Sequence, residues 1–400
     1  MTVPVSPADW DQRHRVLGAC IGAYFGVRLC QVVTGSLVPG IIETFGVTPG
    51  TVGVVLTGMW AVYALVQLPS GLVADWFGDR AVVVAALLLT AAAMAGQAVA
   101  PVFAVFGVAV AALGGGAGVY YNPATALLDR SGDRLGQAIG LHRVGAQAAG
   151  VLAPTGAAIV SLWYGWRETV GLAAVCVALA AVGFVRLTRR VEPRRRESVS
   201  PEVPQPGRLL DLLLRPHTLT TTVMMTLVEF VGVASMAFMP TLLIGHYDIA
   251  TPGANLLFAL YFGVGAVFQP VAGRLSDRYG RERTVVVLAG AGVVGYAGLA
   301  IGGSVVTAGI GVGLAGLATS STPVIQSRML DGLTVAERRA GFGLFRTGYL
   351  LLGASGTAAV GVLAAALGWD AAAWLLAVCF LVVVVVGVAT QPAESATRER

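Results

Sequence analysis

Two ionisable side chains lie deep inside long apolar runs of the sequence. Arg28 comes thirteen residues after Arg15, about 20 Å along a helix, and Glu229 lies at a similar depth in a later run. If these runs cross a membrane, a charge near the centre costs at least about 2.5 to 3.5 kcal/mol, so each group needs a partner or a task. The two residues are therefore the first candidates for chemistry.

The chemistry expected of each follows from its side chain. A guanidinium carries a fork of donors that matches carboxylate or phosphate, so we expect Arg28 to bind an anionic group. We expect Glu229 to be a proton site, or to pair with Arg28 when the site is empty. The alternative is a permanent structural salt bridge between Arg28 and Glu229 that has no chemical role.

Helical spacing extends both positions into polar stripes. Tyr24, Arg28 and Gln31 fall on one helix face, and Thr222, Thr226 and Glu229 fall on another. Each stripe is expected to line a central cavity for a small-molecule substrate. Further polar and aromatic candidates, for which hydrogen bonding between helices is the alternative role, are Tyr63, Tyr120, Tyr121, Asn122 and Tyr261.

The composition indicates a polytopic α-helical membrane protein. Of 400 residues, 56% are hydrophobic and 12% are charged, about half the usual charged share of a soluble domain. Apolar runs of about 20 residues are long enough to cross a bilayer. Twelve such helices are predicted, near 16–42, 51–74, 81–100, 102–128, 138–162, 168–187, 218–244, 253–275, 284–301, 304–329, 340–366 and 371–390.

The arginines predict the orientation in the cell membrane. With the N-terminus inside, 22 arginines fall at cytoplasmic positions, Arg28, Arg143 and Arg346 lie within helices, and Arg167 alone lies outside. Both termini are then cytoplasmic. The predicted parts are a cytoplasmic N-terminus (1–15), a six-helix half (16–187), a cytoplasmic linker (188–216), a second six-helix half (217–390) and a cytoplasmic tail (391–400).

The two halves repeat in sequence at a nearly constant offset. Gln67, Gly71 and Asp75 recur 202 residues later as Gln269, Gly273 and Asp277. Asp129 recurs as Asp331 at the same offset, and the pattern Gly140, Arg143, Gly145 and Gly150 recurs 203 residues later as Gly343, Arg346, Gly348 and Gly353. Two homologous halves related by an axis along the membrane normal characterise one large class of transporters.

At this point the chain resembles the major facilitator superfamily. The most specific element is a loop signature between the second and third helices, present as GLVADWFGDR (Gly71, Asp75, Gly78 and Arg80) and again as GRLSDRYGRER (Gly273, Asp277, Arg278, Gly280 and Arg281). The first copy departs from the pattern at Trp76 and Asp79. The resemblance implies twelve helices in two pseudo-symmetric bundles and loops that act as a conformational latch; the alternative is a solvated turn that only sets topology.

The signature also has a physical interpretation. Its first glycine is expected to allow close helix packing, its later glycine to supply a turn with permissive backbone angles, and its aspartate to face a helix N-terminus. Arg143 and Arg346 lie one to two turns from cytoplasmic helix ends, where they are expected to snorkel or to pair with Asp129 and Asp331 in a structural or gating role. His142 and His217 are expected at the cytoplasmic interface.

These features predict a monomeric secondary active transporter that works by alternating access in the lipid bilayer. The first two helices resemble the organic anion:proton symporter branch of the family, whose helix 1 arginine Arg28 matches, although Val27 stands where that branch has an acid. Proton-coupled anion symport is therefore the leading hypothesis, and proton-driven efflux of a lipophilic compound is the alternative. A receptor or an intramembrane enzyme is the alternative from a different class.

No cofactor, metal site or nucleic-acid partner is expected. The four cysteines all lie in apolar runs, away from polar loops where a metal cluster could assemble. The glycine cluster between Leu113 and Gly118 lacks the lysine of a nucleotide-binding P-loop, which argues against a pump driven by ATP.

Overall fold

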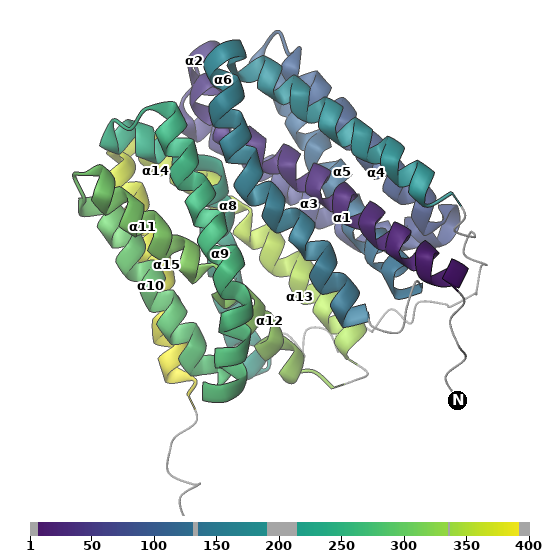
Figure 1. Cartoon of the computed structure of the whole chain (residues 1–400). Helices are drawn as coiled ribbons and strands as arrows, with labels where there is room; N and C mark the ends of the chain where they lie inside the picture. The colour runs from purple at the N-terminus through teal and green to yellow at the C-terminus, as the bar shows by residue number, and fades with distance from the viewer. Residues whose placement is uncertain (1–6, 131–134, 190–213, 335–336, 392–400) are drawn as a thin grey trace, which may run out of the picture. The chain divides into compact units, whose positions relative to one another are not determined.

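The computed structural model describes residues 7–130, 135–189, 214–334 and 337–391 (Figure 1). The predicted cytoplasmic N-terminus, linker and tail lie wholly or partly outside these residues. Within them the chain is helical and contains no strand. The helices of the first half are α1 (Pro7–Ser36), α2 (Val38–Phe45), α3 (Pro49–Phe77), α4 (Asp79–Ala98), α5 (Phe103–Arg130) and α6 (Leu135–Leu187).

The described residues of the second half are also helical, but they are divided into more helices. Its helices are α8 (Pro216–Tyr247), α9 (Thr251–Tyr279), α10 (Arg281–Ile301), α11 (Val305–Ala318), α12 (Ser321–Asp331), α13 (Arg338–Gly353), α14 (Ser355–Leu367) and α15 (Trp369–Ala389). Helices α11 and α12 together form one predicted span, and so do α13 and α14.

Helix α6 accounts for two membrane crossings. Among the described residues, 11 helical stretches are long and apolar enough to span a membrane. Helix α6 is 53 residues long, about 80 Å, which exceeds the roughly 30 Å of a hydrocarbon core. Gly165 interrupts it with φ 84° and ψ −177°, a conformation that only glycine adopts readily. The break falls between the predicted spans 138–162 and 168–187, so the twelve-helix membrane fold is confirmed.

Three predicted spans are divided where a single helix was expected. The span 16–42 breaks between α1 and α2, 304–329 breaks between α11 and α12, and 340–366 breaks between α13 and α14. In the first two cases a proline, Pro39 or Pro323, lies in the first turn of the second piece. A proline ring clashes with the carbonyl of the preceding turn, which interrupts the helix there.

The chain forms two compact units. One comprises Met1–Pro201, Ala234–Ala259 and Thr357–Val362, and the other comprises Glu202–Val233, Leu260–Gly356 and Leu363–Arg400. In the first unit α1 packs most extensively along α6, as Figure 1 shows, and α5 packs against α3 and α4. In the second unit α10 packs against α15 and α11.

The two copies of the loop signature join α3 to α4 and α9 to α10. Gly78 has φ 85° and Gly280 has φ 91°, so the prediction that the later glycine makes the turn is confirmed. The prediction that the first glycine allows close packing is wrong. A Cβ added at Gly71 or Gly273 would meet no described atom within 4 Å, so no described helix packs closely at either position.

The two glycines of the second copy provide a matched test of this assignment. Gly280→Ala places a side chain at φ 91° and ψ 154°, a region that is essentially restricted to glycine, and is expected to destabilise the protein by about 1 to 3 kcal/mol. Gly273→Ala lies within α9 in open space and is expected to cause no loss. Thermal unfolding of the purified variants in detergent measures both, and equal effects would contradict the assignment.

Candidate functional site

Helix α1 presents the predicted polar stripe in the first unit. The Arg28 guanidinium donates through Nη1 to Gln31 Oε1 at 2.9 Å, and through Nη2 to the sulfur of Met236 at 3.6 Å. Gln31 is buried, and its Nε2 has no hydrogen-bond partner among the described residues. The stripe therefore offers hydrogen-bond donors, with Arg28 held in place by the amide oxygen of Gln31.

An aromatic cluster lies one turn from Arg28. The ring of Tyr24 stacks on His142 of α6 with centroids 4.5 Å apart, and its centroid lies 5.7 Å from those of both Tyr120 and Tyr121 of α5. The Tyr120 hydroxyl lies 2.8 Å from the carbonyl oxygen of Cys20 and 2.9 Å from His142 Nε2. The structure thus brings the predicted residues Tyr24, Arg28, Gln31 and Tyr121 into one region, which we call the helix 1 site.

His142, expected at the cytoplasmic interface, packs among helices of the first unit. Its side chain is fully buried, as is that of Tyr120. Helix α6 begins at Leu135, three residues before the predicted span, so His142 lies two turns inside the helix, where its ring reaches α1 and α5. One signal in the sequence could have indicated this burial. His142 is followed directly by Arg143, a charged residue within a predicted helix, and Arg143 is half-buried in the structure.

Other predicted site residues contact side chains or backbone of neighbouring residues. Asn122 Nδ2 donates to the carbonyl oxygen of Gln67 at 2.6 Å and to Ser70 Oγ at 3.0 Å, which joins α5 to α3. This supports the alternative role for Asn122, hydrogen bonding between helices. Tyr63 of α3 is half-buried, with its ring edge-on to Trp60 at 5.3 Å.

Glu229 and Tyr261 belong to the second unit. Glu229 is half-buried on α8, where its Cβ lies against Gly353 of α13. Tyr261 is buried on α9, and its ring is edge-on to that of Phe262 at 5.3 Å. Both side chains therefore sit among helices of the second half.

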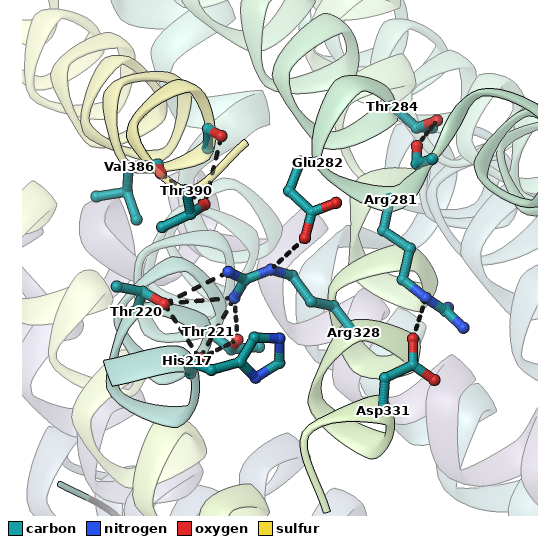
Figure 2. Close-up of polar contacts among 12 residues, drawn as sticks. His217, Thr220, Thr221, Arg281, Glu282, Thr284, Arg328, Asp331, Val386 and Thr390 are labelled. Carbon is teal, nitrogen blue, oxygen red and sulfur yellow. Dashed lines mark hydrogen bonds and ion pairs between the residues drawn. The ribbon is translucent and has the colours of Figure 1, made fainter. Parts of the chain in front are cut away.

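A second polar cluster surrounds Arg328 at the end of α12 (Figure 2). Its side chain is only 3% exposed and donates from Nε to Glu282 Oε1 at 3.1 Å. Its Nη1 donates to the hydroxyl of Thr221 and, at 3.4 Å, to the carbonyl oxygen of His217. Sequence reasoning missed this arginine, although Arg328 falls inside the predicted span 304–329, where a charge needs a partner.

The signature loop of the second unit is tied to the same helix end. Arg281, the first residue of α10, forms an ion pair with Asp331, the last residue of α12. The sequence predicted Arg346 as a partner for Asp331, whereas the structure pairs Asp331 with Arg281 (Figure 2). Arg346 is half-buried on α13, two turns from its start.

The first copy of the loop makes a different contact. Arg80 donates from Nε to Thr188 Oγ1 at 3.1 Å and from Nη2 to the carbonyl oxygen of Val185 at 3.2 Å. A cation is favourable beside the last carbonyls of a helix, here the end of α6. Asp75 and Asp277 are exposed, as is Asp129 at the end of α5. Arg278 is also exposed, with its guanidinium 5.3 Å from the ring centroid of Tyr279.

A surface ion pair lies between two spans of the second unit. Arg215 Nη2 lies 2.8 Å from Glu337 Oε1, and the backbone N–H of Thr334 donates to Glu337 Oε2 at 3.0 Å. These donors, Arg215 first, lower the pKa of Glu337 to about 2. The pair therefore stabilises the fold at neutral pH, and that contribution is lost as the pH falls from about 4.5 toward 2.

The described residues contain no group of three or more histidine, cysteine, aspartate or glutamate side chains that could hold a metal ion. The chemistry available at the helix 1 site is therefore that of hydrogen-bond donors, a guanidinium and an imidazole.

Several solved structures share this fold. A mutant of nucleoside transporter NupG aligns with a TM-score of 0.81 at 13% identity, over 94% of this chain and 99% of its own. A bacterial homolog of the human lysosomal transporter Spinster aligns at 0.78 and 15% identity, over 96% and 97%. A POT family transporter in complex with 5-aminolevulinic acid aligns at 0.75 and 13% identity, over 93% and 95%. At these identities the likeness shows the fold alone.

Sequence comparison gives the family. No curated protein matches the chain. The family model described as Major Facilitator Superfamily matches residues 20–329 and 222–400, which together cover nearly the whole sequence. This family match indicates a transporter and not an enzyme. The chain is a multi-pass membrane protein that belongs to the Major Facilitator Superfamily.

Proposed function

We propose that this protein is a proton-coupled symporter of small organic anions that works by alternating access of its two homologous halves. One observation carries the proposal. Arg28 is half-buried in an apolar helix and contacts a neutral amide oxygen and a thioether sulfur. Among the described residues of its own unit, no carboxylate lies within ion-pair distance of it.

This environment favours an anionic ligand. A guanidinium away from water is stabilised most by a charged acceptor, and hydrogen bonds to ionised groups are roughly twice as strong as those between neutral groups. Gln31 Oε1 and the Met236 sulfur supply only neutral acceptors. The unpartnered Gln31 Nε2 adds a second donor beside the guanidinium. A carboxylate has two acceptor oxygens, so it can engage both groups.

The fold neighbours are compatible with such a ligand. One of them, the POT family transporter, is described in complex with 5-aminolevulinic acid, a molecule that carries a carboxylate. For this chain we infer a small organic carboxylate as the substrate and Glu229 as one proton site. The remaining predicted contacts, Tyr63, Tyr121, Asn122 and Tyr261, are proposed to shape the rest of the binding region.

The aromatic rings of the helix 1 site favour a second candidate function. Tyr24, Tyr120, Tyr121 and His142 form a continuous set of ring contacts. Rings of this kind bind apolar ligands through their faces. Proton-driven efflux of a lipophilic compound would use these rings and would not require Arg28.

The polar contacts of the signature loops support a gating role. Arg281 ties the α9–α10 turn to α12, and Arg80 ties the α3–α4 turn to the end of α6. Each turn is thereby fixed to its own half, so it would move with that half during a rocking motion. We propose that the exposed Asp75, Asp277 and Asp129, with Arg143 and Arg346, contribute contacts that differ between the gating states.

The distribution of arginines supports a proposal for the orientation of the protein in the membrane. The single outer arginine, Arg167, donates to the carbonyl oxygens of Ala98 and Ala100, and so it is engaged at the end of α4. We infer a monomer in the cell membrane with both termini in the cytoplasm, because the arginines concentrate on that side.

Transport by proteoliposomes tests the proposed substrate. The panel comprises lactate, benzoate and 5-aminolevulinate, with tetraphenylphosphonium as a lipophilic cation. We expect an inward proton gradient to drive accumulation of at least one anion. Arg28→Ala is expected to reduce that accumulation by about 100-fold or more, because the charged acceptor then loses its charged donor.

Arg28→Lys and Glu229→Gln refine this test. Lysine keeps the charge but loses the planar fork, so it is expected to restore uptake only in part. Glu229→Gln is expected to lower proton-driven accumulation of the anion. Transport of tetraphenylphosphonium that persists in Arg28→Ala, without anion uptake by the wild type, would favour the efflux function instead.

Two of the ion pairs described in the second unit, Arg328–Glu282 and Arg215–Glu337, should differ in their contribution to stability. Arg328→Met leaves Glu282 without its buried partner and is expected to cost about 3 to 5 kcal/mol. The Arg215–Glu337 pair is 47% and 27% exposed, so Glu337→Gln is expected to cost about 1 kcal/mol or less. Thermal unfolding in detergent compares the two. Equal small effects would show that the Arg328 cluster does not hold α12 in place.

A further inference from the structure

The hydrogen bonds around His142 determine which ring nitrogen carries its proton. The Tyr120 hydroxyl oxygen lies 2.8 Å from the Cys20 carbonyl oxygen, and two oxygens this close need a hydrogen between them. The carbonyl can only accept, so the hydroxyl donates its one hydrogen there. At the 2.9 Å contact, His142 Nε2 must then donate to Tyr120 Oη. The neutral ring therefore has its lone pair on Nδ1.

His142 Nδ1 has no partner among the described residues. The side chain is fully buried, and Nδ1 receives no hydrogen bond. Buried polar atoms in native structures are nearly always hydrogen-bonded, so an exception requires an explanation. The lone pair on Nδ1 is the basic position of this neutral ring, so a proton can bind there while the Nε2 hydrogen bond to Tyr120 stays in place.

We propose that His142 Nδ1 is a proton-binding site of the first half, occupied together with an anion at Arg28. This inference rests on the proposed function, proton-coupled anion symport. The proton comes from water on one side of the membrane and returns to water on the other. His142 is then a second proton site, in addition to Glu229 of α8.

The groups facing His142 explain how the two ligands would be coupled. Helix α1 contributes the Cys20 carbonyl and the Tyr24 ring, and α5 contributes Tyr120 and Tyr121. The face of Tyr24, 4.5 Å from the imidazole centroid, can stabilise a protonated ring.

Within the described part of the chain, the charged residues next to this cluster are two arginines. Arg143 follows His142 on α6, and Arg28 lies one turn beyond Tyr24 on α1. An anion at Arg28 supplies the negative charge that a protonated ring attracts. Each ligand then strengthens binding of the other, and this coupling is reciprocal.

Two variants separate proton coupling from substrate binding in proteoliposomes. The probe is whichever of lactate, benzoate and 5-aminolevulinate the wild type accumulates most. Proton-driven accumulation and the accompanying proton flux are measured beside counterflow, which needs no net proton movement. In His142→Gln we expect accumulation to fall at least about tenfold more than counterflow. The control His246→Gln changes a ring that contacts Tyr247, outside the cluster, and should behave like the wild type.

A direct titration keeps the inference testable if His142→Gln does not fold. The chain has four histidines, so His14→Gln, His217→Gln and His246→Gln together leave His142 as the single imidazole. Nitrogen NMR of this protein in nanodiscs follows Nδ1 between pH 5 and 9, with and without the probe anion. We expect the anion to move the protonation midpoint upward by about one pH unit, a tenfold change in proton affinity.

The outcomes distinguish this inference from the proposed function. Wild-type protein that couples protons to anion uptake, with an unchanged proton-to-anion ratio in His142→Gln, would overturn the role of His142 alone. An Nδ1 that stays unprotonated with and without anion would do the same. Absence of any proton-coupled anion uptake in the wild type would overturn both the proposed function and the inference.

Discussion

Hydrocarbon offers no hydrogen-bond partner to a backbone amide, and this constraint shapes every described segment of the chain. A spanning segment must satisfy its N–H and C=O groups internally, which a helix does. Little backbone is therefore left outside the helices. Single glycines with positive φ make the sharpest connections, at Gly46, Gly78, Gly165, Gly280 and Gly368. At Gly78 and Gly280 one residue separates two successive helices.

Features that depend on local composition could be predicted from the sequence. The apolar runs gave twelve crossings, and the break at Gly165 falls in the predicted gap even though the helix continues on both sides of it. The turn glycines Gly78 and Gly280 could be assigned because a positive φ depends on the local backbone of the turn and not on distant contacts. The packing of Gly71 and Gly273 could not be predicted, because close approach depends on which helix faces the position, and no described atom lies within 4 Å of a Cβ built there. The burial of His142 could not be predicted for a related reason, because it depends on how α6 packs against α1 and α5.

The internal repeat preserves positions but not partners. At an offset of 202, Asp79 and Arg80 correspond to Arg281 and Glu282, so the order of charge is reversed between the halves. Arg80 accordingly binds the end of α6, whereas Glu282 binds Arg328. Ala126 occupies the position that matches Arg328, so this arginine has no counterpart at the matching position of the first half. Spacing therefore located the loops, but their contacts required the structure.

Two of the helical arginines, Arg28 and Arg328, show how one side chain can serve structure or recognition. Arg328 meets a carboxylate, a hydroxyl and a carbonyl oxygen, so its charge and its donors are engaged within the protein. Arg28 meets an amide oxygen and a thioether sulfur, which leave its charge uncompensated by any carboxylate of its own unit in the described residues. A ligand that brings a negative charge gains the full electrostatic interaction there, whereas a neutral ligand does not. The contrast in partners, more than the presence of a charge, makes Arg28 the better candidate for recognition.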